Sequence, residues 1–417
     1  MGSDMERSKI TSRTHVLVMS DDISEEGGIR SRVLGELSLV ARHAELDIVA
    51  KTRVANLRRM KKARNEIASV LPSAHLWFVP YLPHRGFIFA KEFVSLLNVV
   101  IMVTAGFVIG LRTRPSTIYA HNMECSIVAV ILGRLLGTRV TGDFHGDEVE
   151  ENLVAFSWRR AGLRFRLWKR LMGVVVRACP LVVCVSEKHR IHFEESYGRN
   201  KPVIIVPCCA NPNGVSGNHP GKNREASTTK PCGERFVLLY SGSSSAHQLV
   251  PKMIEFNESL NKSGTESCLL LLISDKSQWV REELLSGPAA ESVKVDSVSH
   301  EKVRTYAEEA DVGLLFREDQ VFNNISSPTK FSEYLMAGLP VLLSPHIGDF
   351  SEIVLSHKLG RIVDLQRMGD SEYVGSIVRE VRDDQGIRDR CRDYGVHNLS
   401  WDAVEPNVLR AFGIESE

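Results

Sequence analysis

Short apolar runs alternate with helix-length segments through most of this chain, and this alternation limits the possible folds more than any other feature. It predicts strand–helix–strand units, whose strands lie parallel in one sheet between layers of helices. The candidate strands are 15–19, 46–50, 75–79, 117–120, 139–144, 181–185 and 203–206 in the first half and 235–240, 269–273, 293–296, 312–316 and 341–343 in the second. The expected fold class is therefore α/β.

A polar segment divides this alternation in two. Residues 211–234 are rich in Gly, Asn, Ser and Pro and nearly free of large apolar side chains, which predicts a linker. A chain of 417 residues is also too long for one ordinary core. We expect Rossmann-like domains over 1–210 and 235–399, with parallel sheets that face each other across a cleft. A last helix over about 400–417 has no docking place fixed by the sequence, and packing back on the first domain is one option.

The stretch 310–344 carries the strongest indication of a binding site. A polar loop and a helix that begins near Pro328 lie between two apolar runs, which places the helix N-terminus at the carboxyl edge of the sheet. A helix N-terminus at this edge favours phosphate. Lys330 and Glu333 are three residues apart and share one helix face. A cation for phosphate beside a carboxylate for sugar hydroxyls suits a nucleotide sugar.

The same stretch resembles a known family. SPTKFSEYLMAGLPV, residues 327–341, is similar to the pattern S-P-x-K-x-x-E-Y-L-x-x-G-x-P-V of family 4 glycosyltransferases of the GT-B fold. The first half agrees more loosely, at Gly27-Gly28, at DFHG (143–146) and at VSE (185–187). The resemblance implies a donor-binding second domain, an acceptor-side first domain, and transfer from a nucleotide sugar with retention of anomeric configuration.

Three residues take roles from this resemblance. It implies that Glu333 accepts hydrogen bonds from the donor ribose, that Lys330 neutralises the diphosphate, and that His145 lies against the donor sugar near the reacting carbon. The role of Lys330 is chemically reasonable, because the departing nucleoside diphosphate carries charge that must be stabilised. The alternatives are an exposed helical ion pair for Lys330 and Glu333, and a structural role for His145.

One departure from the family pattern concerns carboxylates. Family members often carry two glutamates with seven residues between them, and the earlier position in this chain is Ile325. The carboxylate that would hold the donor sugar is therefore missing. Glu318 or Asp319 in the preceding loop could replace it.

A second departure concerns cations. Many members carry Arg and Lys after the first strand of the second domain, where this chain has YSGSSS (240–245). Gly242 and Ser243 can still bring backbone and hydroxyl donors to phosphate. Arg317 is a candidate second cation, with a surface ion pair as its alternative, and Ser327 is a further donor contact. Gly28, beside a helix N-terminus, suits a donor or acceptor phosphate or is part of a plain tight turn.

Neither a metal nor a redox cofactor is expected. His145 and Asp147 suggest a metal, but the spacing places no third ligand. The patterns GxGxxG, GxxxxGK[ST] and GxSxG are absent. We therefore expect metal-independent chemistry with a UDP- or GDP-linked sugar as substrate.

The charge distribution suggests an anionic surface as a partner. Residues 1–210 hold 30 Lys and Arg against 20 Asp and Glu. Seven of these cations lie in 158–178 among Trp158, Phe165 and Trp168, and six more lie in 53–64 without an acid. This composition suits the headgroup region of an anionic membrane, and its alternative is a solvated basic face. Nucleic acid is not expected, because no reader motif appears.

Two observations bear on location. Residues 93–111 are uncharged, and we expect a buried or membrane-grazing helix, because a spanning helix would separate strands of one sheet. The eight cysteines form no CxxC pair, and MGSDMERSK has no apolar core of a secretory signal. Reduced thiols and a cytoplasmic protein, peripheral on the inner face of the plasma membrane, are the expectation.

The sequence thus predicts a hexosyltransferase-type enzyme whose acceptor is a glycan or lipid-linked glycan, as in the synthesis of a surface polysaccharide. Two alternatives stay open. One is a nucleotide-sugar epimerase of the same fold. The other is a non-catalytic glycan-binding or partner subunit, which Ile325 and the missing Arg and Lys make more credible.

Overall fold

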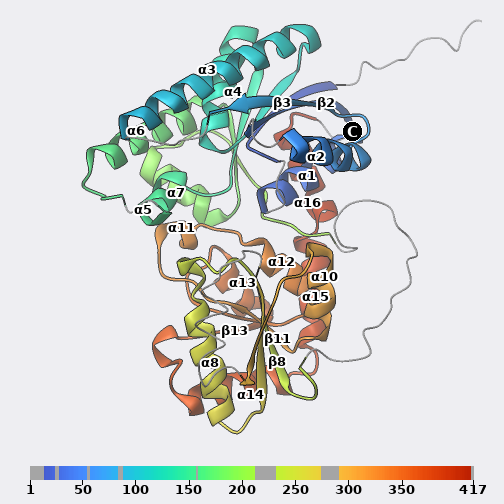
Figure 1. Ribbon diagram of the computed structural model, residues 1–417, viewed down its shortest axis with the longest axis vertical. Helices are drawn as coiled ribbons and strands as arrows, with labels where there is room; N and C mark the ends of the chain where they lie inside the picture. The colour runs from blue at the N-terminus through green and yellow to red at the C-terminus, as the bar shows by residue number, and fades with distance from the viewer. Residues whose placement is uncertain are drawn as a thin grey trace, which may run out of the picture.

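Two parallel sheets form the framework of the computed structural model, which describes residues 14–23, 28–53, 57–82, 88–155, 158–211, 232–273 and 291–414. The first sheet has the order β3-β2-β1-β4-β5-β6-β7 and the second the order β10-β9-β8-β11-β12-β13. The strands of the first sheet are β1 (Thr14–Ser20), β2 (Ala44–Arg53), β3 (His75–Tyr81), β4 (Thr117–His121), β5 (Arg139–Phe144), β6 (Leu181–Cys184) and β7 (Val203–Ile205). Those of the second are β8 (Phe236–Gly242), β9 (Ser267–Ile273), β10 (Val293–Asp296), β11 (Val312–Leu315), β12 (Val341–Leu343) and β13 (Gly360–Ile362). The expectation of two Rossmann-like domains is confirmed (Figure 1).

Helices cover both sheets. The first domain contains α1 (Gly28–Val40), α2 (Leu57–Val70), α3 (Ile88–Thr113), α4 (Asn122–Leu136), α5 (Glu148–Ala155), α6 (Leu163–Ala178) and α7 (Glu187–Tyr197). After β8 come the 3₁₀ turn Ala246–Gln248, α8 (Val250–Lys262), α10 (His300–Glu309), α11 (Val321–Asn324), α12 (Thr329–Met336), α13 (Phe350–His357), a 3₁₀ turn at Leu365–Arg367, α14 (Ser371–Asp383), α15 (Ile387–Asn398) and α16 (Trp401–Ala411). Most of the expected linker, 212–231, lies outside the described residues.

The first sheet is covered differently on its two faces. One core joins the sheet to α1, α2 and α16 through side chains such as Leu37, Ile67 and Val408. The other core joins it to α3, α4, α6 and α7 through side chains such as Met102 and Val176. Helices α2 and α6 therefore lie on opposite faces of this sheet.

The last helix, α16, packs on the first domain. The indole of Trp401 lies where α1 has Gly35, and a Cβ at that glycine would lie 2.2 Å from the indole Cε2. Phe412 stacks on Tyr119 of β4 with ring centroids 3.8 Å apart. The chain thus crosses to the second domain and returns after α15.

The helix α3 crosses the outer face of the first domain. Its segment Phe93–Thr113 is long and apolar enough to span a membrane by length and composition. It nevertheless packs against α4 and against β1, β2 and β3. Part of its apolar surface faces outward, with Phe93, Leu96 and Val100 more than half exposed.

The cysteine expectation needs a correction. Cys232 and Cys268 of the second domain form a disulfide, with Cα atoms 6.2 Å apart. Spacing could not reveal this pair, because the pairing of β8 with β9 brings Cys232, which precedes β8, close to Cys268 of β9, 36 positions later in the chain. The other six cysteines are free thiols.

Candidate active site

The carboxyl edges of the two sheets face each other, because the contacts between domains come from segments that directly follow strands. Ser186, after β6, donates from Oγ to the carbonyl of Ile325 at 2.7 Å. The amide of Cys208 donates to Ser327 Oγ at 2.9 Å. Asp349, after β12, accepts from the first two amides of α7. These contacts hold polar side chains of both edges within one interdomain region. The two domains lie one above the other in Figure 1.

Lys330 lies in the first turn of α12, at the edge of the second sheet. Its Nζ donates to Tyr240 Oη at 3.2 Å and to Gln248 Oε1 at 2.9 Å, and lies 4.3 Å from the Tyr240 ring centroid. Burial and the nearby charge of Arg317 hold the pKa of Lys330 well below its usual range, against the opposite effect of Glu333. An anion placed beside Nζ would therefore relieve an electrostatic cost.

Gly242 ends β8 beside this ammonium. Its φ of 148° is one that residues with a side chain rarely adopt, and a Cβ there would lie 2.8 Å from Lys330 Nζ. The adjacent Ser243 accepts at its carbonyl from Tyr240 Oη at 2.6 Å. The tyrosine thus ties the loop after β8 to Lys330, and the structure brings these candidates together.

Arg317 follows β11 and points into the same loop region. Its Nη1 donates to Asn323 Oδ1 and to Ser326 Oγ, both at 3.2 Å. Burial lowers its pKa, while Tyr240 and Glu151 of α5 act to raise it. Because α5 belongs to the first domain, Arg317 lies where the two domains meet. In the described part of the chain it forms no ion pair with a carboxylate within 4 Å, unlike the surface pair considered as its alternative.

The remaining donor candidates have different surroundings. Glu333 lies one turn after Lys330 and is half-buried. Ser327 is buried, and its hydroxyl accepts the interdomain bond from Cys208. Gly28 is the first residue of α1, whereas Gly27 lies outside the described residues. The donor roles of all three stay predictions.

The position of the missing glutamate is part of the domain contact. Ile325 is buried, with 4% of its surface exposed, and its carbonyl accepts from Ser186. Glu318 and Asp319 are exposed, and Asp319 accepts from Asn324 Nδ2 at 2.8 Å. A carboxylate at position 325 would be placed in this buried contact.

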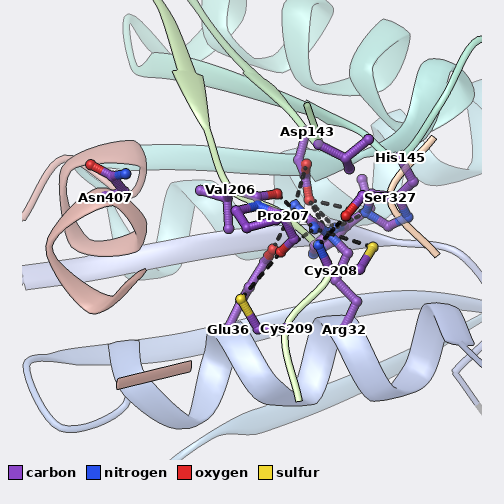
Figure 2. A network of polar contacts seen from close by, with 12 residues as sticks. Arg32, Glu36, Asp143, His145, Val206, Pro207, Cys208, Cys209, Ser327 and Asn407 are labelled. Atoms are coloured by element: carbon purple, nitrogen blue, oxygen red, sulfur yellow. Dashed lines mark hydrogen bonds and ion pairs between the residues drawn. The ribbon is translucent and has the colours of Figure 1, made fainter. Parts of the chain in front are cut away.

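His145 belongs to a hydrogen-bonded cluster after β5 (Figure 2). Its Nε2 lies 3.0 Å from Asp143 Oδ2, and His121 Nδ1 lies 3.1 Å from the same oxygen. Its side chain is 15% exposed, whereas those of Asp143 and His121 are fully buried. His145 is therefore the member of this trio that can reach a ligand.

Arg32 of α1 balances the charge of this cluster. Its guanidinium donates to both oxygens of Asp143, at 3.0 and 3.3 Å, and lies 2.9 Å from Glu36 Oε1. Burial alone would raise the pKa of Asp143, but Arg32 and the histidines hold it well below its usual range. The buried carboxylate is therefore ionised at neutral pH.

The tautomer of His145 follows from this ionised partner. A carboxylate only accepts hydrogen bonds, so the ring proton of His145 must lie on Nε2, which faces Asp143. Burial also lowers the pKa of His145, which favours the neutral ring. We infer that Nδ1 carries the lone pair, available to accept a hydrogen bond from a ligand.

The same three residues have the composition of a metal site. Ligand atoms of His121, Asp143 and His145 lie within 4.8 Å of one another. Arg32 already donates to both oxygens of Asp143, so a divalent cation would lie beside a guanidinium and compete for its acceptor. Metal-independent chemistry stays a prediction.

A second polar group at the edge of the first sheet was not identified from the sequence. Lys51 Nζ lies 2.6 Å from both Asp21 Oδ1 and Glu124 Oε2. Asn122 donates to the other oxygen of Asp21 at 2.6 Å. The sequence signal that could have indicated this group is position, because Asp21 and Asn122 each closely follow an apolar strand.

Glu148 predicts a pH dependence of stability. Burial, with the charge of Asp21, raises the pKa of this carboxyl from 4.5 to about 8. The folded state then holds a proton that the unfolded state releases, so this contribution to stability is lost as pH rises through 8. Glu148→Gln keeps an acceptor for the Met123 amide. Between pH 5.5 and 8.5, its urea midpoint should fall less than that of the wild type.

A matched control for this prediction is Glu195→Gln, which removes an exposed carboxylate from α7. Its urea midpoints should follow those of the wild type at both pH values. Equal pH dependence in all three proteins would show that Glu148 is not protonated in the folded state.

Sequence comparison identifies part of the chain. Residues 39–213 match a family model described as Glycosyltransferase Family 4. A search of curated protein sequences gave no match.

Structure comparison covers nearly the whole chain. Sucrose-phosphate synthase (tll1590) from Thermosynechococcus elongatus is 16% identical with a TM-score of 0.73, over 96% of this chain and 98% of that one. Anabaena Alr3699/HepE in complex with UDP is 12% identical with a TM-score of 0.67, over 96% and 100%. WaaG, a glycosyltransferase involved in lipopolysaccharide biosynthesis, is 13% identical with a TM-score of 0.63, over 96% and 100%. The TM-scores and the coverage show a shared fold, the two-domain GT-B arrangement, and at these low identities they show the fold alone.

Proposed function

We propose that this chain, which has the GT-B fold, is a family 4 glycosyltransferase that moves a hexosyl group from a UDP- or GDP-linked sugar to a lipid-linked glycan. The single observation that supports this most strongly is the environment of Lys330. The ammonium is held by two neutral side chains at the edge of the second sheet, and its pKa is lowered. A diphosphate would place anionic charge beside this buried ammonium, in addition to the charge of Glu333.

In the proposed reaction the second domain binds the donor and the first domain binds the acceptor. The bond between the sugar and the diphosphate breaks, a bond to the acceptor oxygen forms, and the acceptor proton passes to the departing phosphate oxygen. Lys330 and the N-terminus of α12 stabilise the charge on the diphosphate. Glu333 accepts from the ribose hydroxyls. Proton transfer to the phosphate on the face where the acceptor attacks gives retention, and none of these steps requires a metal.

His145 orients the donor sugar. Its Nδ1 lone pair accepts a hydrogen bond from a sugar hydroxyl, while Nε2 stays fixed by Asp143. The buried pair of Asp143 and Arg32 keeps the ring from turning. A histidine held in one tautomer positions a sugar more accurately than a mobile one, because less conformational entropy is lost on binding.

The acceptor is expected at the edge of the first sheet. Lys51, with Asp21 and Glu124, offers charged groups that can hydrogen-bond to glycan hydroxyls. WaaG, which shares this fold, is a glycosyltransferase involved in lipopolysaccharide biosynthesis. A lipid-linked glycan of surface-polysaccharide synthesis, met at the inner face of the plasma membrane, is the corresponding acceptor for this chain.

The test is incubation of the folded protein with a panel of UDP- and GDP-sugars, with and without lipid-linked glycans, followed by chromatography and mass spectrometry. We expect one donor to give free nucleoside diphosphate and an acceptor lengthened by one sugar. Conversion of the donor to another nucleotide sugar without acceptor would indicate an epimerase instead. If the folded protein neither binds nor turns over any nucleotide sugar, this result would contradict catalysis and favour a partner subunit.

A further inference from the structure

An open pocket of about 550 Å³ lies on the outer side of the first domain, between α6 and α7. Aromatic residues Phe165 and Tyr197 contribute to its lining. Its cationic lining residues are Arg166, Lys169, Arg170 and Arg177, and no carboxylate lines it. We propose that this pocket binds the phosphate headgroup of an anionic membrane lipid. The inference is independent of the transfer reaction and assigns a second binding site to the chain.

The cations of this pocket are not neutralised. Arg166 and Arg177 donate to backbone carbonyls. Among the described residues, neither they nor Arg170 lies within 4 Å of a carboxylate. Among the carboxylates that the structure describes, Lys169 reaches Glu150 alone, at 3.8 Å, and that carboxylate already pairs with Arg160 at 2.8 Å. Three guanidinium groups therefore keep their charge available for phosphate, which guanidinium binds in a bidentate manner.

A row of exposed apolar side chains indicates that the phosphate belongs to a lipid. Leu163, Leu167, Leu171 and Val174 are 83%, 59%, 37% and 56% exposed. Their spacing of four, four and three residues places them along one face of α6, next to the pocket cations. A soluble phosphate would leave these side chains in water, whereas a membrane interface accepts them between lipid headgroups.

The apolar surface continues onto the neighbouring helices. α4 packs against both α3 and α6, and the three helices cover one face of the first sheet (Figure 1). Ile131 and Leu135 of α4 are 37% and 59% exposed, and Phe93 and Leu96 of α3 are 68% and 61% exposed. This three-helix face offers a broad contact with a membrane.

The second basic segment of the sequence lies elsewhere. Residues 53–64 fall largely on α2, which packs on the opposite face of the first sheet from α6. One flat membrane therefore cannot contact both segments. Lys61 and Lys62 of α2 are exposed cations and supply a matched control for the pocket arginines.

The pocket also lies away from the candidate active site. Arg177 and Tyr197 are near the carboxyl ends of α6 and α7, and helices of a parallel sheet run opposite to its strands. Those helix ends lie at the edge of the sheet that faces away from the second domain. Lipid bound there leaves the donor side open, so membrane binding and turnover can be measured separately.

The experiment measures sedimentation of the full chain with vesicles of equal phosphatidylglycerol and phosphatidylcholine, and with vesicles of phosphatidylcholine alone. Four proteins are compared: the wild type, Arg166→Gln/Arg170→Gln, Leu163→Ser/Leu167→Ser and the control Lys61→Gln/Lys62→Gln. Circular dichroism and thermal unfolding establish that each is folded. A further arm adds millimolar inorganic phosphate or glycerol phosphate as a competitor.

We expect the wild type and the lysine control to bind anionic vesicles equally and neutral vesicles weakly. The arginine variant should bind about 30-fold more weakly, the factor for losing two cations near an anionic surface, and the leucine variant should also lose binding. The inference would be overturned by equal loss in the lysine control, or by unchanged binding of either the arginine variant or the leucine variant. Complete displacement of the wild type from vesicles by soluble phosphate would overturn the assignment to a lipid and indicate a site for free phosphate. Absence of vesicle binding by the wild type would overturn the inference as well.

Discussion

Replacing Lys330 by alanine should lower kcat/KM for the nucleotide-sugar donor by about 10²- to 10³-fold, the loss typical of removing one preorganised group that stabilises transition-state charge. The ammonium lies beside Gly242, with neutral partners in Tyr240 and Gln248. Steady-state kinetics with the preferred donor, together with calorimetric titration of the nucleoside diphosphate, measure this loss.

Stability separates this role from a structural one. Because burial disfavours the charged form of Lys330, its removal should not lower the thermal midpoint by more than a few degrees. Lys252→Ala removes a half-exposed lysine of the same domain and should leave kinetics and stability unchanged. If Lys330→Ala unfolds the protein, or binds the diphosphate as tightly as the wild type, the assigned role is wrong.

Replacing Arg32 by alanine should lower the free energy of unfolding by about 3–5 kcal/mol, because it leaves buried carboxylates without their counter-charge. Asp143 loses two hydrogen bonds and Glu36 loses its ion pair. Arg32 also donates to the carbonyls of Val206 and Pro207, so the variant loses these hydrogen bonds to the segment after β7 as well. Urea unfolding followed by tryptophan fluorescence measures the loss.

The pH dependence of this loss identifies its cause. Burial raises the pKa of Glu36 from 4.5 to about 7 even with Arg32 present, and removing Arg32 should raise it further. A raised carboxyl pKa favours the folded state at low pH, so the loss should be larger at pH 8 than at pH 6.

Arg42→Ala supplies the control for Arg32. Arg42 forms exposed pairs with Asp402 and Glu405 at 3.8 and 3.5 Å, and its removal should cost at most about 1 kcal/mol. Equal losses for Arg32→Ala and Arg42→Ala, or a loss without pH dependence, would contradict the account of this cluster.

The fold could be predicted largely from sequence, because apolar alternation is a local pattern. The strand β10 was placed at its observed bounds, 293–296. β13 was missed, because three residues with a central Arg361 show no apolar run, and pairing with β12 defines this strand. The return of α16 to the first domain is one option from the sequence, but its docking place could not be fixed, because it depends on the space that Gly35 leaves for Trp401.

Part of the candidate site could likewise be predicted from the sequence, and part could not. Lys330, Gly242 and Ser243 could be named in advance, because a family pattern and the strand ends locate them. The Arg32 cluster could not, since Arg32 and Asp143 are 111 residues apart and nothing local shows that an arginine of α1 is buried. Ser327 shows that the family pattern does not reveal every contact of a residue inside it. Its hydroxyl already accepts a hydrogen bond from the Cys208 amide between the domains.

A structure of the protein with its nucleoside diphosphate tests the central claim most directly. The account predicts that the diphosphate lies beside Lys330 Nζ, near Gly242 and the N-terminus of α12, with the sugar side of the ligand toward His145. It also predicts proton uptake on binding at a pH above the lowered pKa of Lys330, since the diphosphate restores the charged form. A nucleotide bound elsewhere, without contact to Lys330, would contradict the assignment of the donor site.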